Sequence, residues 1–161
     1  LPKNAANGQV SVSVKGRTLF NHVNNGIDYA NWSIQGTGTT KGSNGIHLVQ
    51  SSSPFDFARL NINLQPNKEY TLIINIKAKT GTAILFQEEK SIFNEQINMS
   101  SNLGINKFKF TTPTTITYNR LYFFIVGNEG DYVDFEVYAI LEGDYTIDNS
   151  GFNPSYFGSM S

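Results

Sequence analysis

Hydrophobic and polar residues alternate with a period of two along much of the chain. From residue 70 to residue 76 every second side chain is apolar or aromatic, and the same alternation occurs at residues 10–14, 58–64 and 107–110. Successive side chains of a β-strand point to opposite faces, so this period predicts strands that bury one face. No window shows a sustained 3.6-residue period, and we therefore expect at most a turn or two of helix.

The strongest pair of predicted strands lies near the C-terminal end, at residues 117–126 and 132–141. The five residues between them are Gly127, Asn128, Glu129, Gly130 and Asp131. Glycine and asparagine tolerate the positive φ of a tight reversal, so this segment predicts a β-hairpin. Residues 90–103 form the longest poorly patterned stretch, which predicts a crossover loop.

About nine or ten short strands at this spacing predict an all-β fold, an antiparallel β-sandwich of the jelly-roll type. We assign the sandwich to residues 10–144. Residues 1–9 and 145–161 are rich in Asn, Gly, Ser and Pro, and we interpret them as a linker and as an exit linker toward a following module. Because the chain starts at Leu1, we expect it to be a piece of a longer protein.

The composition excludes several classes of partner. The formal net charge is −1 and the lysines are scattered, so no basic patch predicts nucleic-acid binding. No apolar run approaches the ~20 residues of a membrane helix, and we expect no membrane contact. Cysteine is absent, which excludes a disulfide framework and thiolate chemistry.

The sequence contains no catalytic signature, and we predict no catalytic residue. His22 and His47 lie far apart without metal-ligand spacing. No G-x-S-x-G turn is present. Glu88 and Glu89 after Phe86 are the one carboxylate pair that we consider for the acid and base of a glycosidase, and we interpret them as a solvated strand end. The chain is therefore predicted not to be an enzyme.

Aromatic residues supply the candidate ligand-binding set. Trp32, the only tryptophan, is either a sugar-stacking residue or part of the core, where most single tryptophans of small sandwiches lie. A second aromatic group surrounds the C-terminal strand pair, and part of it must be core. The candidate ligand-binding residues are Trp32, Tyr118, Arg120, Tyr122 and Tyr132.

Asp134 is the candidate metal ligand. It lies in the middle of an apolar strand, opposite in face to Val133 and Phe135. A carboxylate there must be solvated, paired with another group or bound to a metal.

Four segments resemble the jelly-roll carbohydrate-binding modules found beside glycosidases. They are Thr18-Leu19-Phe20-Asn21, residues 27–32, Tyr70-Thr71-Leu72 and residues 132–137 with the sequence YVDFEV. The resemblance covers about residues 10–141. It implies carbohydrate binding and a structural Ca²⁺ held by residues near the first strand and by the late aspartate, which corresponds to Asp134.

The two ends resemble segments that open and close accessory sandwiches in phage and prophage tail-fibre and baseplate proteins of Gram-positive hosts. These ends are residues 12–21 and residues 141–160. This resemblance implies a virion tail location outside the host cell, with other fibre or baseplate subunits as partners. A fibre subunit repeats around the tail axis, so we expect a homo-oligomer, most plausibly a trimer.

The predicted function is that of a non-catalytic adhesion module that binds host cell-wall or surface polysaccharide. Two alternatives remain open at this point: a purely structural spacer or oligomerisation domain of a tail fibre, and an accessory module of a glycoside hydrolase. The aromatics Tyr145, Phe152, Tyr156 and Phe157 of the exit segment need burial, either on their own sandwich or on a neighbour.

Overall fold

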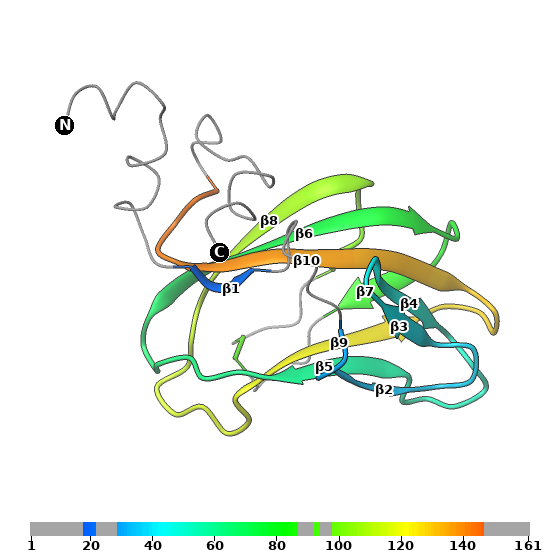
Figure 1. The fold of residues 1–161 in the computed structure, drawn as a ribbon, viewed down its shortest axis with the longest axis horizontal. Helices are drawn as coiled ribbons and strands as arrows, with labels where there is room; N and C mark the ends of the chain where they lie inside the picture. The colour runs from blue at the N-terminus through cyan, green and yellow to red at the C-terminus, as the bar shows by residue number, and fades with distance from the viewer. Residues whose placement is uncertain (1–17, 22–28, 87–91, 94–97, 147–161) are drawn as a thin grey trace.

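The structure, a computed structural model, describes residues 18–21, 29–86, 92–93 and 98–146. Within these residues it is a sandwich of two antiparallel sheets, and no helix occurs there. Figure 1 shows the sheets as an upper and a lower layer. The predicted all-β sandwich is therefore confirmed. No helix in the described residues is long and apolar enough to span a membrane.

The six-stranded sheet is built around one long strand, β10 (Tyr132–Glu142). On one side β10 pairs with β6 (Glu69–Lys79), which in turn pairs with β8 (Gly104–Thr111). Its other side pairs first with β4 (Gly45–Val49) and then with β1 (Thr18–Asn21). The short β3 (Thr40–Gly42) completes the edge beside β4.

The four-stranded sheet has the order β2-β5-β9-β7. Its strands are β2 (Ser33–Gln35), β5 (Phe57–Asn61), β9 (Arg120–Val126) and β7 (Ile84–Phe86). From β4 to β10, every successive strand belongs to the opposite sheet. This alternation between layers is the connectivity that the jelly-roll prediction describes.

The core lies between the two sheets and uses the residues that the period-two pattern selects. Tyr70, Leu72, Ile74 and Ile76 of β6 are all buried, as the alternation predicts. Opposite them, β9 buries every second side chain, and the ring of Phe123 lies 4.7 Å from that of Phe135 on β10. Aromatic contacts of this kind add to the free energy gained from burial alone.

The predicted hairpin between residues 117–126 and 132–141 is wrong. β9 pairs with β5 and β7, whereas β10 pairs with strands of the other sheet. Both strands carry one continuous apolar face, and the chain packs these faces against each other across the core instead of pairing the strands edge to edge. Gly130, in the connection between β9 and β10, has a φ of 94°. This glycine therefore does serve a tight turn.

The poorly patterned stretch from residue 90 to 103 contributes to the core. Of its described residues, Ile92, Phe93 and Met99 are buried, and the ring of Phe93 stacks 4.1 Å from Phe110. Its backbone is tied to β7, where Met99 N–H donates to the Leu85 carbonyl at 2.7 Å. None of its described residues forms part of an extended strand, so the prediction of a connecting loop agrees with the structure there.

The predicted strand at residues 10–14, the N-terminal linker and most of the exit segment lie outside the described residues. Tyr145, the first aromatic of the exit segment, packs on its own sandwich. Its ring contacts a small apolar cluster on the six-stranded sheet, and its backbone N–H donates to Thr71 Oγ1 at 2.9 Å. Phe152, Tyr156 and Phe157 are not among the described residues.

The alternation along β9 makes a direct prediction about stability. Phe123→Ala removes a fully buried ring and should lower the free energy of unfolding by about 3–5 kcal/mol. Phe124→Ala is the matched control, because its ring is on the outer face and half-buried, and it should cause a much smaller loss. Urea denaturation followed by circular dichroism measures both. Equal losses for the two variants would contradict the inward and outward assignment.

Candidate functional site

Aromatic and arginine side chains gather on the outer face of the four-stranded sheet. Because Leu121, Phe123 and Ile125 of β9 point into the core, the alternate residues of β9 point outward. The same holds on β5, where Ala58 is buried between two outward residues. We call this outer surface the aromatic–arginine face. It consists of Phe57, Arg59, Tyr118, Arg120, Tyr122 and Phe124.

The strand register brings these residues into ordered pairs. Phe57 lies opposite Phe124, and Arg59 lies opposite Tyr122. The rings of Tyr122 and Phe124 stack with their centroids 4.6 Å apart and their planes 7° from parallel. Phe57 meets both of them edge-on, at 5.1 and 6.0 Å. The three rings therefore support one another in a fixed arrangement rather than moving independently.

The two arginines of the face lie against these rings. The Arg59 guanidinium is 5.8 Å from the centre of Tyr122 and 5.7 Å from Phe57. The Arg120 guanidinium is 4.9 Å from Tyr118 and 6.0 Å from Tyr122. At these distances a cation is attracted to the face of the ring, so two positive charges lie within 6.0 Å of the centre of the Tyr122 ring.

The loop before β5 is held by a buried carboxylate. Asp56 is 1% exposed and accepts hydrogen bonds from the Ser51 backbone N–H (2.8 Å), the Ser51 hydroxyl (2.7 Å) and the Gln50 side chain (3.2 Å). Gly36 on the neighbouring loop leaves room for it, since a Cβ there would lie 2.3 Å from Asp56 Oδ1. These contacts fix the point at which β5 begins, and so fix the position of Phe57.

The loop before β10 joins the same network. Gln50 N–H donates to the Asp131 carbonyl, and Gly130 N–H donates to the Gln50 carbonyl, both at 2.8 Å. The Asp131 carboxylate accepts hydrogen bonds from the Asn128 backbone N–H and the Thr82 hydroxyl, each at 2.8 Å. Both bonds favour the ionised carboxylate, and they lower the pKa of Asp131.

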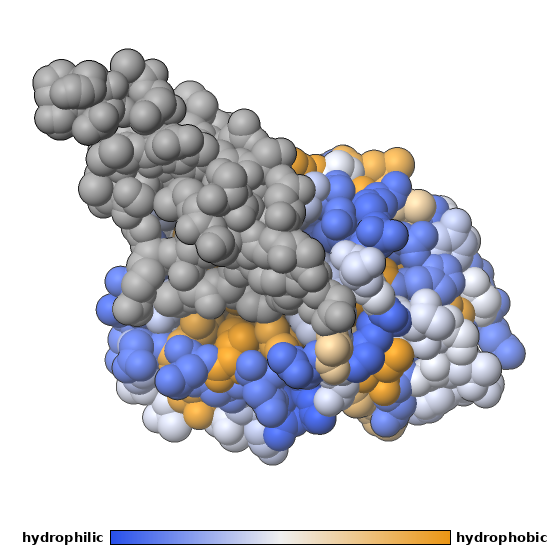
Figure 2. All heavy atoms as spheres, in the orientation of Figure 1, coloured by the Kyte–Doolittle hydropathy of each residue, from blue (hydrophilic) through white to orange (hydrophobic). Residues whose placement is uncertain are grey.

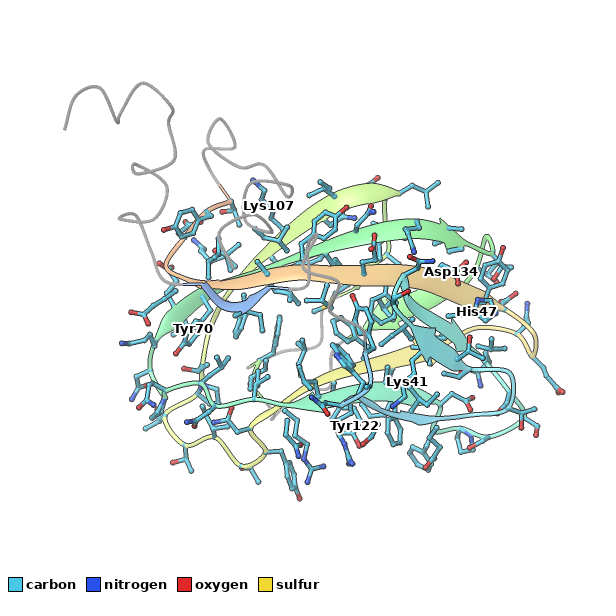
Figure 3. The ribbon with its side chains drawn as sticks, viewed as in Figure 1. Lys41, His47, Tyr70, Lys107, Tyr122 and Asp134 are labelled. Carbon is cyan, nitrogen blue, oxygen red and sulfur yellow. The ribbon has the colours of Figure 1, made fainter. Side chains whose placement is uncertain are left out.

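Of the five candidate ligand-binding residues, three meet on the aromatic–arginine face. Tyr118 is 49% exposed, and Arg120 and Tyr122 are half-buried beside it. Figure 3 shows Tyr122 at the lower margin of the molecule, on the side turned away from the six-stranded sheet. In Figure 2 that lower margin is mainly hydrophilic, with hydrophobic residues between the polar ones.

Sequence reasoning missed the two residues of this face that come from β5. Phe57 and Arg59 alternate with Ala58 and Leu60, and this alternation predicts that they lie outside the core. What the alternation does not give is that β5 is the neighbour of β9. That pairing joins Phe57 to Phe124 and Arg59 to Tyr122, which are more than sixty positions apart in the chain.

Trp32 does not belong to the candidate site. Its side chain is 2% exposed and packs in the core against Tyr29 and Phe123, with ring centroids 5.4 and 6.0 Å away. A ligand at the surface cannot stack on a ring covered in this way. Trp32 directly precedes β2. Burial of its large apolar ring between the sheets gives a lower free energy than exposure of the ring to water.

Tyr132 lies on the other sheet, in a separate cluster. Its ring is 5.0 Å from that of His47, and His47 Nδ1 makes a short contact with the Asp134 carboxylate. Figure 3 shows His47 and Asp134 side by side at the end of the six-stranded sheet. Tyr132 is therefore not brought together with Tyr118, Arg120 and Tyr122.

The Asp134 carboxylate has a histidine side chain as a described neighbour. A calcium ion takes six to eight oxygen ligands, whereas the neighbour of the Asp134 carboxylate is an imidazole nitrogen. Among the residues that the structure describes, no group of three or more His, Cys, Asp or Glu side chains could hold a metal ion. Residues 22–28, beside the first strand, are outside the described part, so calcium stays a prediction.

No protein-family model matches the sequence, and no curated protein matches it. Solved structures with a similar fold include the CBM22-1–GH10 modules of Clostridium thermocellum xylanase 10B, complexed with xylohexaose. The identity is 15% over 81% of this chain, with a TM-score of 0.49. The chain spans 29% of the length of that xylanase fragment.

Two further similar structures are single modules. The N-terminal cellulose-binding domain of Cellulomonas fimi β-1,4-glucanase C is 14% identical, with 71% of this chain and 90% of that chain covered and a TM-score of 0.43. A mutant of the family 29 carbohydrate-binding module CBM29-2 is 10% identical, with coverages of 83% and 99% and a TM-score of 0.46. Because these identities and TM-scores are low, we base the function on the side chains of this chain.

The hydrogen bonds to Asp131 predict how the stability of this end of the sandwich depends on pH. The folded-state pKa lies below the ordinary value of 3.8, so the ionised carboxylate stabilises the fold at neutral pH. That stabilisation is lost as the pH falls below 3.8 through the folded-state pKa. Asp131→Asn should therefore be less stable than the parent chain at pH 7 and equally stable in strong acid.

Urea denaturation at a series of pH values measures this difference. Glu129→Gln, which removes an exposed carboxylate from the same loop, is the control. A gap between Asp131→Asn and the parent chain that is the same at every pH would contradict the assignment of the stabilisation to the ionised carboxylate.

Proposed function

We propose that this chain is a non-catalytic carbohydrate-binding module and that the aromatic–arginine face is its binding surface. The observation that carries the proposal is the ring of Tyr122, which is half-buried, stacked on Phe124 and close to two guanidinium groups. A sugar ring has an apolar C–H face and a rim of hydroxyl groups. Aromatic rings receive the former, and the fixed N–H donors of arginine receive the latter.

The dimensions of the face favour a chain of sugars over a single one. From Arg120 to Phe124 the strand rises by about 14 Å at the usual spacing of an antiparallel strand, which is longer than one sugar ring. The face is also continued sideways by Gln35 and Ser33 of β2, which lie opposite Phe57 and Arg59. We therefore propose an oligosaccharide segment within a polysaccharide as the ligand.

Binding without hydrolysis is the activity that this face supports best. A glycosidase of the usual type needs two carboxyl groups on either side of the scissile bond. Among the described residues of the aromatic–arginine face and its β2 neighbours, none is Asp, Glu or His. Aromatic stacking and hydrogen-bond donors need no such pair.

For the biological setting, we propose a phage or prophage tail appendage that attaches to the surface polysaccharide of its host, outside the cell. The support is the resemblance of residues 12–21 and 141–160 to tail-fibre and baseplate segments. In that setting the chain is one copy of a homo-oligomer, a trimer, with other fibre or baseplate subunits as neighbours. The packing of Tyr145 on its own sheet is compatible with an isolated domain that is monomeric.

The binding proposal predicts the effect of removing one ring. Tyr122→Ala should weaken binding of a recognised polysaccharide about two- to tenfold, since loss of one stacking contact costs about 0.5–1.5 kcal/mol. Tyr138→Ala is the matched control, because Tyr138 is a half-buried tyrosine on the outside of the other sheet. The ligand is first identified on a glycan array, and affinities follow by isothermal titration calorimetry. Equal affinities for Tyr122→Ala and the parent chain would contradict the proposal.

A further inference from the structure

We propose that the polysaccharide bound by the aromatic–arginine face is anionic and that its recognised units are uronic acids. This inference rests on the proposed function and names the chemical class of its ligand. It starts from two arginines, Arg59 directly opposite Tyr122 on β5 and Arg120 two residues before it on β9. Their guanidinium groups are 5.8 and 6.0 Å from the centre of the Tyr122 ring.

Arginine residues are concentrated on the aromatic–arginine face. The sequence has nine lysines but only three arginines, and two of the three lie on this face. Lysine would supply the same charge, so charge alone does not account for the choice. Arginine differs in presenting a planar fork of N–H donors that matches a carboxylate with two parallel hydrogen bonds.

The charge of the face is also one-sided. Within the described residues it carries two guanidinium groups and no carboxylate, although the chain as a whole has a net charge of −1. Two described carboxylates at the other sheet lie beside lysines, Glu142 at 3.5 Å from Lys68 and Asp144 at 3.4 Å from Lys109. A positive face on a nearly neutral chain attracts an anionic polymer and not a neutral one.

The spacing of rings and guanidinium groups favours a carboxylate attached directly to a sugar ring. In a uronic acid the carboxylate is bonded to a ring carbon, so a sugar bound beside Tyr122 holds its charge next to that ring. Both guanidinium groups lie within 6.0 Å of the centre of the Tyr122 ring. A phosphate that links sugars lies farther from the stacked ring and is tetrahedral, so it matches the planar fork less closely.

The test compares carboxylated polysaccharides with their own neutral forms. Polygalacturonate, alginate and hyaluronate are each paired with the carboxyl-reduced polymer, and a phosphate-linked teichoic acid, a sulfated glycan and neutral glycans complete the panel. Affinity electrophoresis and calorimetry at 20 and 300 mM salt give the binding constants. We expect at least one carboxylated polymer to bind about tenfold or more tightly than its reduced form, with a preference that shrinks at high salt.

Variants assign that preference to the face. Arg59→Gln and Arg120→Gln should each reduce the preference for the carboxylated polymer several-fold while retaining weak binding to the reduced one. Lys107→Gln is the matched control, since it removes one positive charge from the six-stranded sheet, and Figure 3 shows Lys107 on the opposite margin from Tyr122. Unfolding midpoints for all three confirm that the variants are folded.

The outcomes separate the two proposals. Equal or tighter binding of reduced or neutral polymers overturns the uronic acid assignment and leaves carbohydrate binding intact. A preference for the teichoic acid or the sulfated glycan over every carboxylated polymer overturns it as well. Failure to bind any polymer of the panel or any member of a glycan array overturns both the assignment and the proposed function.

Discussion

β9 packs against β10 across the core, and this contact orients the side chains of β9. The rings of Phe123 and Phe135 meet 4.7 Å apart between the sheets, and Trp32 stacks on Phe123 with the ring centroids 6.0 Å apart. Since the side chains of a strand alternate, fixing Leu121, Phe123 and Ile125 inward leaves no choice for the residues between them. The same contact that closes the core therefore presents Tyr122 and its neighbours to the outside.

The outward residues form a surface because β5 lies next to β9 in register. A shift of one residue would place Ala58 and Leu60 beside the rings of Tyr122 and Phe124, and the arginine of β5 would face the core. Asp56 disfavours such a shift, because its three hydrogen bonds fix the position of the chain immediately before Phe57. A buried carboxylate that lost these partners would be strongly unfavourable. The geometry of the candidate site thus depends on a residue that is not part of it.

Local pattern predicted the strands, and long-range packing decided what the pattern could not. The alternation at residues 70–76 identified the buried face of β6 correctly. It could not decide whether residues 117–126 and 132–141 pair edge to edge or pack face to face, because both arrangements bury the same alternate side chains. The loop between them is compatible with both edge-to-edge pairing and face-to-face packing. Which of the two arrangements forms depends on the other strands with which β9 and β10 can pair.

The candidate site was predictable to the extent that it lies on one strand. Tyr118, Arg120 and Tyr122 were found because they are close in sequence, whereas Phe57 and Arg59 reach the same surface through a pairing across sixty residues. Trp32 and Tyr132 were included for their residue type alone. Trp32 is not part of the candidate site because it is buried between the sheets. Tyr132 is not part of it because it lies on the six-stranded sheet.

The location of the binding surface is measured most directly by NMR, from the backbone amide chemical shifts of the chain during titration with a recognised oligosaccharide. We expect the shifts to change along β5 and β9, with the largest changes near Arg59, Arg120 and Tyr122. Amides of β6 and the His47–Asp134 end of β10 should change little. Changes confined to the six-stranded sheet, with β5 and β9 unaffected, would contradict this location.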